Sequence, residues 1–157
     1  MGKPLWRIEG FVTAAGNSVV QKWFWDEIGV EVRDALRDRM NYLMAVEKHL
    51  WMEPGFKWFR DIGEVRKRVS TGALRVYGYF PDDSNTFVFL HGVVKQKTKD
   101  REGVETARKR LKRLKNGEGS THEFNFKERT PSADSTGQED QSSIGGIKSF
   151  GGNSLPN

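Results

Sequence analysis

Residues 86–115, TFVFLHGVVKQKTKDREGVETARKRLKRLK, decide the fold because an apolar strand pattern passes directly into a basic helix pattern. The apolar run predicts a β-strand over residues 86–95, and Asp100 is suited to cap a helix that extends to about Asn116. Ten basic and three acidic residues lie within residues 95–115, a net charge of +7, whereas the whole chain of 157 residues carries +5. Positive charge concentrated beside a strand is typical of a surface that binds phosphate groups.

The preceding part of the chain predicts two helices and three further strands, joined by turn-like segments. The aromatic-rich residues 56–61 are expected to pack under the sheet. The short turns between the last three strands indicate an antiparallel meander. The predicted elements are a strand over residues 5–13, a short helix from Asn17 or Ser18 to about Ile28, a longer helix over residues 30–51, and strands over residues 64–70 and 74–80.

The expected fold is α+β, with the order β-α-α-β-β-β-α. About four strands form a small antiparallel or mixed sheet, and two N-terminal helices and a basic C-terminal helix pack on one face of it. From residue 118 the chain contains six Gly and seven Ser and lacks Trp, Tyr and Val. Such a composition buries too little apolar surface to offset the entropy of ordering it. The sequence therefore predicts one domain, residues 1–117, followed by a disordered tail, residues 118–157.

The composition excludes several classes of site. The chain contains no cysteine, so it has no disulfide, no thiolate zinc site and no cysteine nucleophile. Three histidines leave little room for a His-rich metal cluster, and we expect neither a metal nor a cofactor. The N-terminus lacks the apolar core of a signal peptide, and no apolar run approaches the ~20 residues of a membrane span. We therefore expect a soluble, cytoplasmic protein without a membrane partner.

Strand alternation brings several basic residues to one face of the predicted sheet. Arg66 and Arg68 alternate along one strand and Arg75 lies in the next, so hairpin pairing would place all three on one surface. Lys95 and Lys97 share a side of the last strand if that strand continues. Each of these residues, taken singly, is more often a solvated surface charge. Together, with the basic helix at their rim, they favour an anionic partner.

Two segments, LRVYGYF at 74–80 and FVFLHGVVKQKTKD at 87–100, match strands of a known family, and a basic terminal helix follows in both. On these segments, residues 5–116 resemble the RelE/HigB superfamily of toxins from bacterial type II toxin–antitoxin systems, and in particular its phage-derived HigB-like branch. The resemblance implies a RelE-like fold and an mRNA interferase, an endoribonuclease that cuts mRNA on the translating ribosome. It also implies metal-free attack of a ribose 2′-OH on the adjacent phosphate.

The resemblance also implies roles for the basic residues. By their positions in the family's strands, Arg68 and Arg75 match phosphate-binding residues of the catalytic site, and Arg66 matches a more peripheral, RNA-binding one. Lys95 and Lys97 match the basic pair that ends the last strand. Guanidinium groups suit such a site because they bind phosphate bidentately and remain charged. Four basic residues of the last helix are expected to contact ribosomal RNA or, alternatively, only to solvate the helix: Arg108, Lys109, Lys112 and Arg113.

The residue that would accept the 2′-OH proton is left open. Some members of the family carry a catalytic Tyr in the last helix, but residues 98–117 contain no Tyr and no His. His91 has a suitable intrinsic pKa, although a lone His in a strand is more often structural. A lysine whose pKa is lowered by neighbouring cations is another candidate. Tyr77 and Tyr79 are expected to pack in the core or to stack on bases.

Three functions therefore remain open. The first is a ribosome-dependent mRNA endonuclease, whose partners would be mRNA, ribosomal RNA and a cognate helix-turn-helix antitoxin. The second is a gyrase-inhibiting toxin of the related ParE type. The third is a non-catalytic phage module that binds nucleic acid or protein. The basic residues of the sheet favour the first function, and the missing helix tyrosine keeps the third open.

Overall fold

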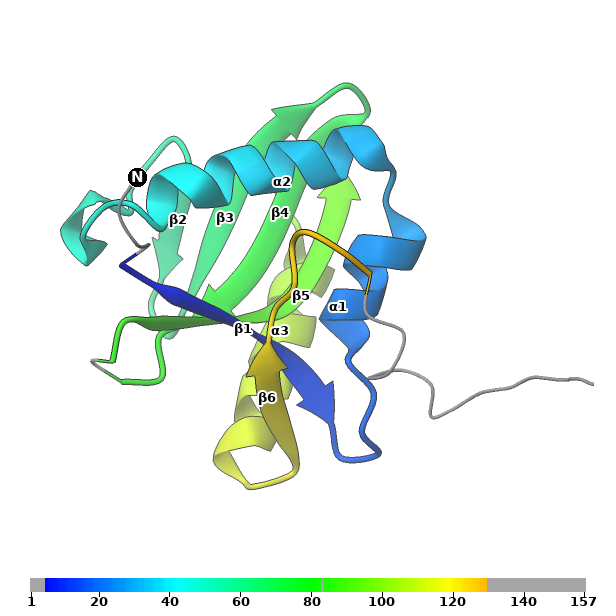
Figure 1. The fold of residues 1–157 in the computed structure, drawn as a ribbon, viewed down its shortest axis with the longest axis vertical. Coiled ribbons are helices and arrows are strands. Elements are labelled where there is room, and N and C mark those ends of the chain that lie inside the picture. The colour runs from blue at the N-terminus through cyan, green and yellow to red at the C-terminus, as the bar shows by residue number, and fades with distance from the viewer. Residues whose placement is uncertain (1–4, 83, 130–157) are drawn as a thin grey trace, which may run out of the picture. The chain divides into compact units, whose positions relative to one another are not determined.

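The computed structural model describes residues 5–82 and 84–129 of the chain (Figure 1). Its helices and strands lie within the first 126 residues, and six strands form one mixed sheet in the order β2-β3-β4-β5-β1-β6. The α+β class is confirmed, with six strands instead of about four. The strands are β1 (Arg7–Thr13), β2 (Phe56–Phe59), β3 (Ile62–Val69), β4 (Gly72–Tyr79), β5 (Thr86–Lys95) and β6 (Gly119–Glu123). The helical segments are α1 (Val19–Lys22), the π-helical turn η1 (Trp23–Glu27), α2 (Val30–Leu43), the 3-10 turn η2 (Lys48–Leu50) and α3 (Arg101–Lys115).

The centre of the sheet is the predicted antiparallel meander of β3, β4 and β5. β1 lies beside β5 and is parallel to it, with Ile8 opposite Phe87. The β3–β4 hairpin turns at Gly72, whose φ is +145°. A Cβ on Gly72 would lie 2.8 Å from the carbonyl oxygen of Lys95. The turn therefore requires glycine, both for its backbone angle and for the close approach of β5.

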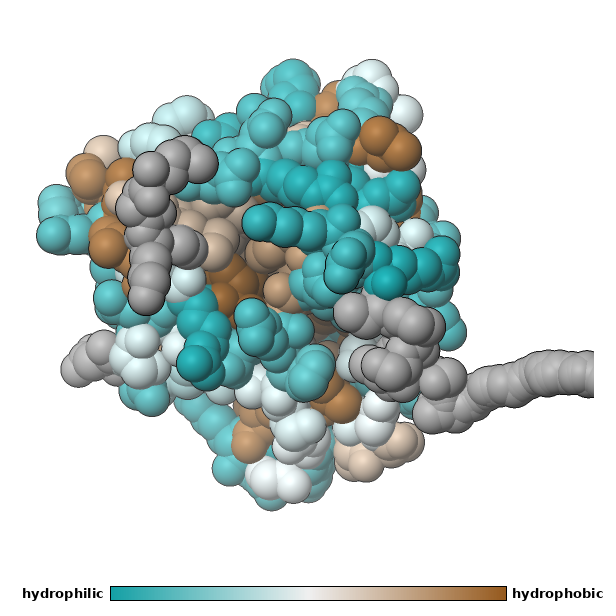
Figure 2. Space-filling model, viewed as in Figure 1, coloured by the Kyte–Doolittle hydropathy of each residue, from teal (hydrophilic) through white to brown (hydrophobic). Residues whose placement is uncertain are grey.

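Helices α2 and α3 cover opposite faces of the sheet, which corrects the expectation that the helices pack on one face (Figure 1). Residues 86–90 of β5 are all buried. Because successive side chains of a strand point to opposite faces, both faces of the sheet must be packed against a helix at this strand. α2 buries Val32, Leu36, Met40 and Leu43, which are spaced three or four apart on one stripe. The outward surface of α2 is mostly hydrophilic (Figure 2).

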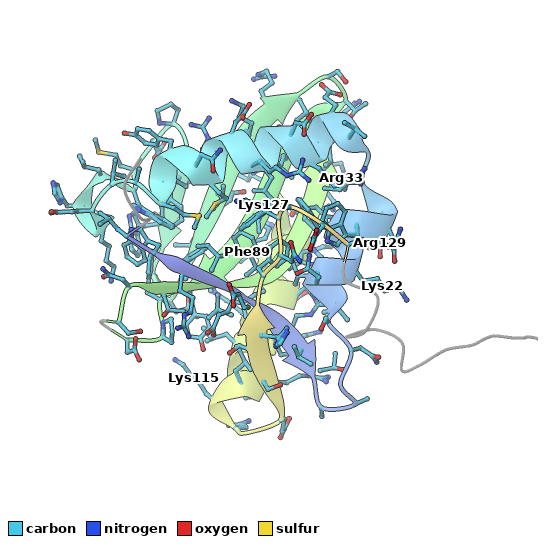
Figure 3. The ribbon with its side chains drawn as sticks, in the orientation of Figure 1. Lys22, Arg33, Phe89, Lys115, Lys127 and Arg129 are labelled. Carbon is cyan, nitrogen blue, oxygen red and sulfur yellow. The ribbon has the colours of Figure 1, made fainter. Side chains whose placement is uncertain are left out.

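The first helical segment is irregular. It is α-helical only over α1 and continues as the π-helical turn η1, where the Ile28 N–H donates to the Trp23 carbonyl at 3.3 Å. Arg33 lies near the start of α2, beside this turn (Figure 3). Its Nη1 donates to the carbonyls of Phe24 (3.3 Å) and Trp25 (3.4 Å). The arginine thus satisfies carbonyl groups that an α-helix ending here would leave without partners.

α2 ends at Leu43, well before the predicted end of the helix. The Leu5 N–H donates to the Met44 carbonyl at 2.8 Å, and the Trp6 indole Nε1 donates to the Val46 carbonyl at 2.8 Å. These carbonyls would accept intrahelical hydrogen bonds if the helix continued. Contacts with the chain that enters β1 therefore replace the last turns of the predicted helix.

β2 arises from the aromatic segment that was expected to pack under the sheet. It is an edge strand that pairs with β3, and its side chains alternate between the two faces. Phe56 points to the α2 face, where it is buried against Gly63. Lys57 and Phe59 alternate with it and therefore lie on the α3 face.

β6 lies within the segment that was expected to be disordered from residue 118. Gly117, with φ +75°, ends α3 in the left-handed conformation and reverses the chain. β6 then pairs with β1 in the antiparallel sense. Phe124 follows it and is 5% exposed, with its ring centroid 4.9 Å from that of Phe89. The folded unit thus continues past residue 117, and residues 130–157 of the predicted tail lie outside the described residues.

Candidate functional site

A cleft opens between α3 and the part of the sheet formed by β2, β3 and β4. Its volume is about 790 Å³, within the range of about 300–1,000 Å³ that is common for ligand sites. Three carboxylates line it, those of Glu64, Asp100 and Glu105, and basic side chains outnumber them. We call it the cationic cleft. Its eight basic residues are Lys57, Arg66, Arg75, Lys99, Arg101, Arg108, Lys109 and Lys112.

α3 is held over the sheet by its N-terminal cap and by a narrow apolar stripe. The Asp100 side chain accepts a hydrogen bond from the Gly103 N–H at 3.1 Å, as the sequence predicts for a cap. A Cβ on Gly103 would clash with the Asp100 carboxylate and would lie 2.8 Å from the Tyr77 ring. Ala107 and Leu111 continue the buried stripe. Because the stripe is narrow, the flanks of the helix remain available for basic residues.

A buried carboxylate links the two sides of the cleft. The Glu64 side chain is fully buried, and its Oε2 accepts a hydrogen bond from Arg75 Nη1 at 2.8 Å. Its Oε1 lies 3.3 Å from Arg66 Nε. Arg75 Nη2 donates to the carbonyls of Lys97 (2.8 Å) and Thr98 (3.0 Å), in the loop before α3. Glu64 and Arg75 therefore tie β3 to the loop that starts the helix.

These contacts place Arg75 differently from the role that the family resemblance implies. Its side chain is 6% exposed. Burial opposes its positive charge, but the hydrogen bond and the attraction to Glu64 outweigh burial, so the pKa of Arg75 is raised. Both of its Nη groups donate to the protein itself. Arg75 acts in this structure as a brace of the cleft wall.

A second buried group fixes the start of α3. The Tyr77 hydroxyl donates to Asp100 Oδ2 at 2.9 Å, and Lys95 Nζ lies 3.1 Å from Asp100 Oδ1. Burial and the charges of Glu64 and Asp100 raise the pKa of Tyr77, so the phenol stays protonated. Hydrogen bonds to Asp100 and Glu102 raise the pKa of Lys95. A lysine that served as a base would need a lowered pKa, which is the opposite direction.

The structure brings together residues that the sequence assigned to two separate surfaces. Arg66 and Arg75 come from the sheet, and Arg108, Lys109 and Lys112 come from α3, yet all five line the cationic cleft. Arg108 also connects α3 to the β2–β3 turn, because its Nε lies 3.1 Å from Asp61 Oδ1 in that turn. Residues of the sheet and of the helix therefore border one hollow.

Other predicted residues lie outside the cleft. Arg68 is exposed and opposite Ala73 near the end of the β3–β4 hairpin. Lys97 is exposed in the loop before α3, where its carbonyl rather than its ammonium group is engaged. Lys95 is paired with acidic residues on the other side of Asp100, and Arg113 is exposed on α3 away from the cleft lining.

His91 lies on the same sheet face but lines a different, smaller hollow of about 370 Å³. Its ring is stacked on that of Tyr77, with centroids 6.3 Å apart. Burial, together with the positive charge of the nearby Arg110, lowers the pKa of His91 to about 4. The imidazole is therefore neutral near pH 7, but it has little tendency to accept a proton. The two hollows share Asp100 and Glu105, and His91 belongs to the lining of the smaller one only.

Sequence reasoning missed several residues of the cleft, among them the buried Glu64. Lys57 and Phe59 belong to β2, which was not predicted as a strand, although the alternation in FKWF was the available signal. Lys99 and Arg101 flank the cap residue and were counted only in the net charge. Glu105, on α3, has no hydrogen bond or ion pair to another side chain among residues 5–82 and 84–129.

No family model matches the chain, and no curated protein matches it. Across the described segments, no group of three or more His, Asp or Glu side chains is arranged to hold a metal ion. In the same segments, no helix has both the length and the apolar character to cross a membrane.

Proposed function

We propose that the protein is an endoribonuclease of the RelE/HigB type, a toxin that cleaves mRNA on translating ribosomes in the cytoplasm. The observation that carries the proposal is the cationic cleft, in which eight basic side chains surround a hollow of about 790 Å³. The sequence resemblance supports it, because the matching segments at 74–80 and 87–100 coincide with β4, β5 and the loop that caps α3. Of these, β4 and the loop before α3 contribute residues to the cleft lining.

The reaction needs cations that hold the phosphodiester and neutralise the charge that develops on it. Arg66 presents a half-buried guanidinium from the sheet, and Lys109 and Lys112 present ammonium groups from the helix. Positive groups that meet the charge developing on the phosphate stabilise a phosphorane-like transition state more than the ground state. Arg75, in this proposal, supports the wall that holds Arg66 and does not touch the phosphate.

The reaction also needs a group that accepts the 2′-OH proton. Glu64 and Asp100 are committed to ion pairs within the protein, at 2.8 Å from Arg75 and 3.1 Å from Lys95. Glu105 is the remaining carboxylate of the cleft lining. In the proposed step Glu105 takes the proton, the 2′-oxygen bonds to phosphorus, and the bond from phosphorus to the 5′-oxygen breaks. The 5′-oxygen takes a proton from a lysine ammonium group, which leaves a 2′,3′-cyclic phosphate and a 5′-hydroxyl.

The test is induced expression in bacteria, with growth and primer extension on cellular mRNA as readouts. We expect the wild type to stop growth and to cut transcripts, whereas Arg66→Ala and Glu105→Gln lose cleavage by about 100-fold or more, since one preorganised group at a transition state commonly contributes that much. Lys22→Ala is the matched control, because Lys22 is an exposed cation on α1, outside the cleft lining (Figure 3). Intact transcripts with the wild type would refute the nuclease proposal.

A non-catalytic nucleic-acid-binding module is the second candidate. The observation that favours it is that Glu64, Arg75, Tyr77 and Asp100 are all engaged within the protein. RNA binding without cleavage by the wild type, and equal binding by Glu105→Gln, would favour this candidate.

The toxin proposal also includes a helix-turn-helix antitoxin as partner. A small helix-turn-helix gene beside this one, whose product co-purifies with the protein and restores growth, would support it. The absence of any neighbouring gene that restores growth would count against a toxin–antitoxin pair.

A further inference from the structure

The cationic cleft has one aromatic side chain with exposed surface in its lining, that of Phe59. Tyr77 also lines the cleft but is fully buried. Phe59 lies on the same side of β2 as Lys57, whose Nζ is 5.1 Å from the centre of the Phe59 ring. The large aromatic cluster of the core, to which Phe56 belongs, packs on the opposite side of the strand. Phe59 is therefore an aromatic group placed among cations.

The backbone that carries the Phe59 ring is held by contacts with both the sheet and α3. The Phe59 carbonyl accepts a hydrogen bond from Arg108 Nη2 at 3.4 Å, and Arg108 Nε pairs with Asp61 in the following turn. β2 pairs with β3, with Phe59 opposite Ile62. The end of the strand is thus held to both the sheet and α3, and this places the Phe59 side chain in the wall of the cleft.

A simple anion would need only the cations. The cleft instead combines cations with an apolar wall of Phe59 and Val104, both half-buried. A nucleotide has the matching combination, because its phosphate is anionic and its base is flat and weakly polar. Aromatic side chains beside basic ones are a common arrangement for single-stranded nucleic acid, in which bases are free to leave the stack.

We infer that Phe59 is the stacking platform for an unpaired base of single-stranded RNA, and that Lys57, whose ammonium group lies over one face of the ring, holds the adjacent phosphate. The inference rests on the proposed function for the identity of the ligand as RNA. It does not require cleavage, and so it is tested by binding alone. A duplex would bind less well at this position, since its bases are already stacked and paired.

The experiment measures binding of a short labelled single-stranded RNA and of an abasic oligomer with the same number of phosphates, by fluorescence anisotropy. Phe59→Ala is expected to weaken binding of the RNA by about tenfold or more. It is expected to leave binding of the abasic oligomer unchanged. Phe59→Trp, which keeps an aromatic face, should bind the RNA as tightly as the wild type.

Phe59→Leu keeps apolar volume without an aromatic face and guards against a loss that comes only from misfolding. It should fold with a thermal midpoint near that of the wild type and still lose RNA affinity. The inference is overturned if Phe59→Leu binds RNA like the wild type, or if the variants weaken both oligomers equally. Base-dependent binding through Phe59 with no cleavage of cellular mRNA would keep this inference and remove the nuclease proposal. Cleavage of cellular mRNA that does not change in the Phe59 variants would keep the nuclease proposal and remove this inference.

Discussion

The two faces of the sheet bury different kinds of side chain. The α2 face buries aliphatic and aromatic side chains such as Leu36, Phe56 and Phe87, all with no exposed surface. The α3 face buries the charged residues Glu64, Arg75 and Asp100. Apolar burial stabilises a fold without fixing particular orientations, whereas a buried charge network costs desolvation and fixes geometry. The α2 face is therefore held mainly by apolar burial, and the α3 face, which also buries Ala107 and Leu111, carries the charge network that borders the candidate site.

The largest expected effect is on the α2 face. Leu36→Ala should lower the free energy of unfolding by about 2–5 kcal/mol, because it removes buried methyl groups and leaves a cavity under α2. Urea unfolding followed by circular dichroism measures the loss. RNA affinity, corrected for the folded fraction, should not change. A fall in the affinity of the folded protein would show that the two faces are not independent.

The sequence predicted α2 and the meander of β3, β4 and β5 more accurately than it predicted the cationic cleft. Apolar spacing in α2 and the patterns of β3, β4 and β5 are local signals, and they hold. β6 was missed because its residues are polar, and its ordering comes from pairing with β1 and from Phe124, which lies outside the strand. A short polar segment has no signal of its own that distinguishes an edge strand from a tail.

The cleft was predicted in part, for a related reason. Alternation placed Arg66 and Arg75 on one face correctly, as their direct cross-strand pairing shows. Alternation could not reveal that Glu64, two residues before Arg66, would form an ion pair with Arg75, because that pair depends on the register of the strands and on the burial of both side chains. The approach of α3 to β2, through Arg108 and Asp61, is a tertiary contact without a sequence pattern.

A smaller effect is expected for Glu64→Gln, on the α3 face. The amide removes the negative charge that balances Arg75 and Arg66, and an incompletely compensated buried guanidinium should cost about 1–3 kcal/mol of unfolding free energy. Unlike Leu36→Ala, this variant should also weaken RNA binding by the folded protein, because the wall that holds Arg66 loses its brace. Urea unfolding and anisotropy on the same preparation measure the two losses.

The control for Glu64→Gln is the double variant Glu64→Leu with Arg75→Met, which replaces the buried pair with apolar side chains. Such replacements are often neutral or stabilising, so stability should recover toward that of the wild type. RNA affinity should stay low, because Arg66 still lacks its carboxylate. Recovery of both properties in the double variant would contradict a positioning role for Glu64.

The last expected effect concerns His91 on the α3 face, and it is confined to acidic pH. Burial, reinforced by Arg110 and opposed by Asp100, lowers the pKa of His91 from 6.5 to about 4 in the folded protein. Between these values the unfolded chain binds a proton that the folded protein does not bind. The contribution of His91 to stability is therefore complete above about pH 6.5 and is lost as the pH falls toward about 4.

His91→Gln should reduce the fall in unfolding free energy between about pH 6.5 and 4, measured by urea titrations at each pH. Leu36→Ala should instead lower the unfolding free energy by the same amount at every pH, so that its dependence on pH is unchanged. Equal slopes in wild type and His91→Gln would show that the imidazole of His91 titrates in the folded protein as it does in the unfolded chain.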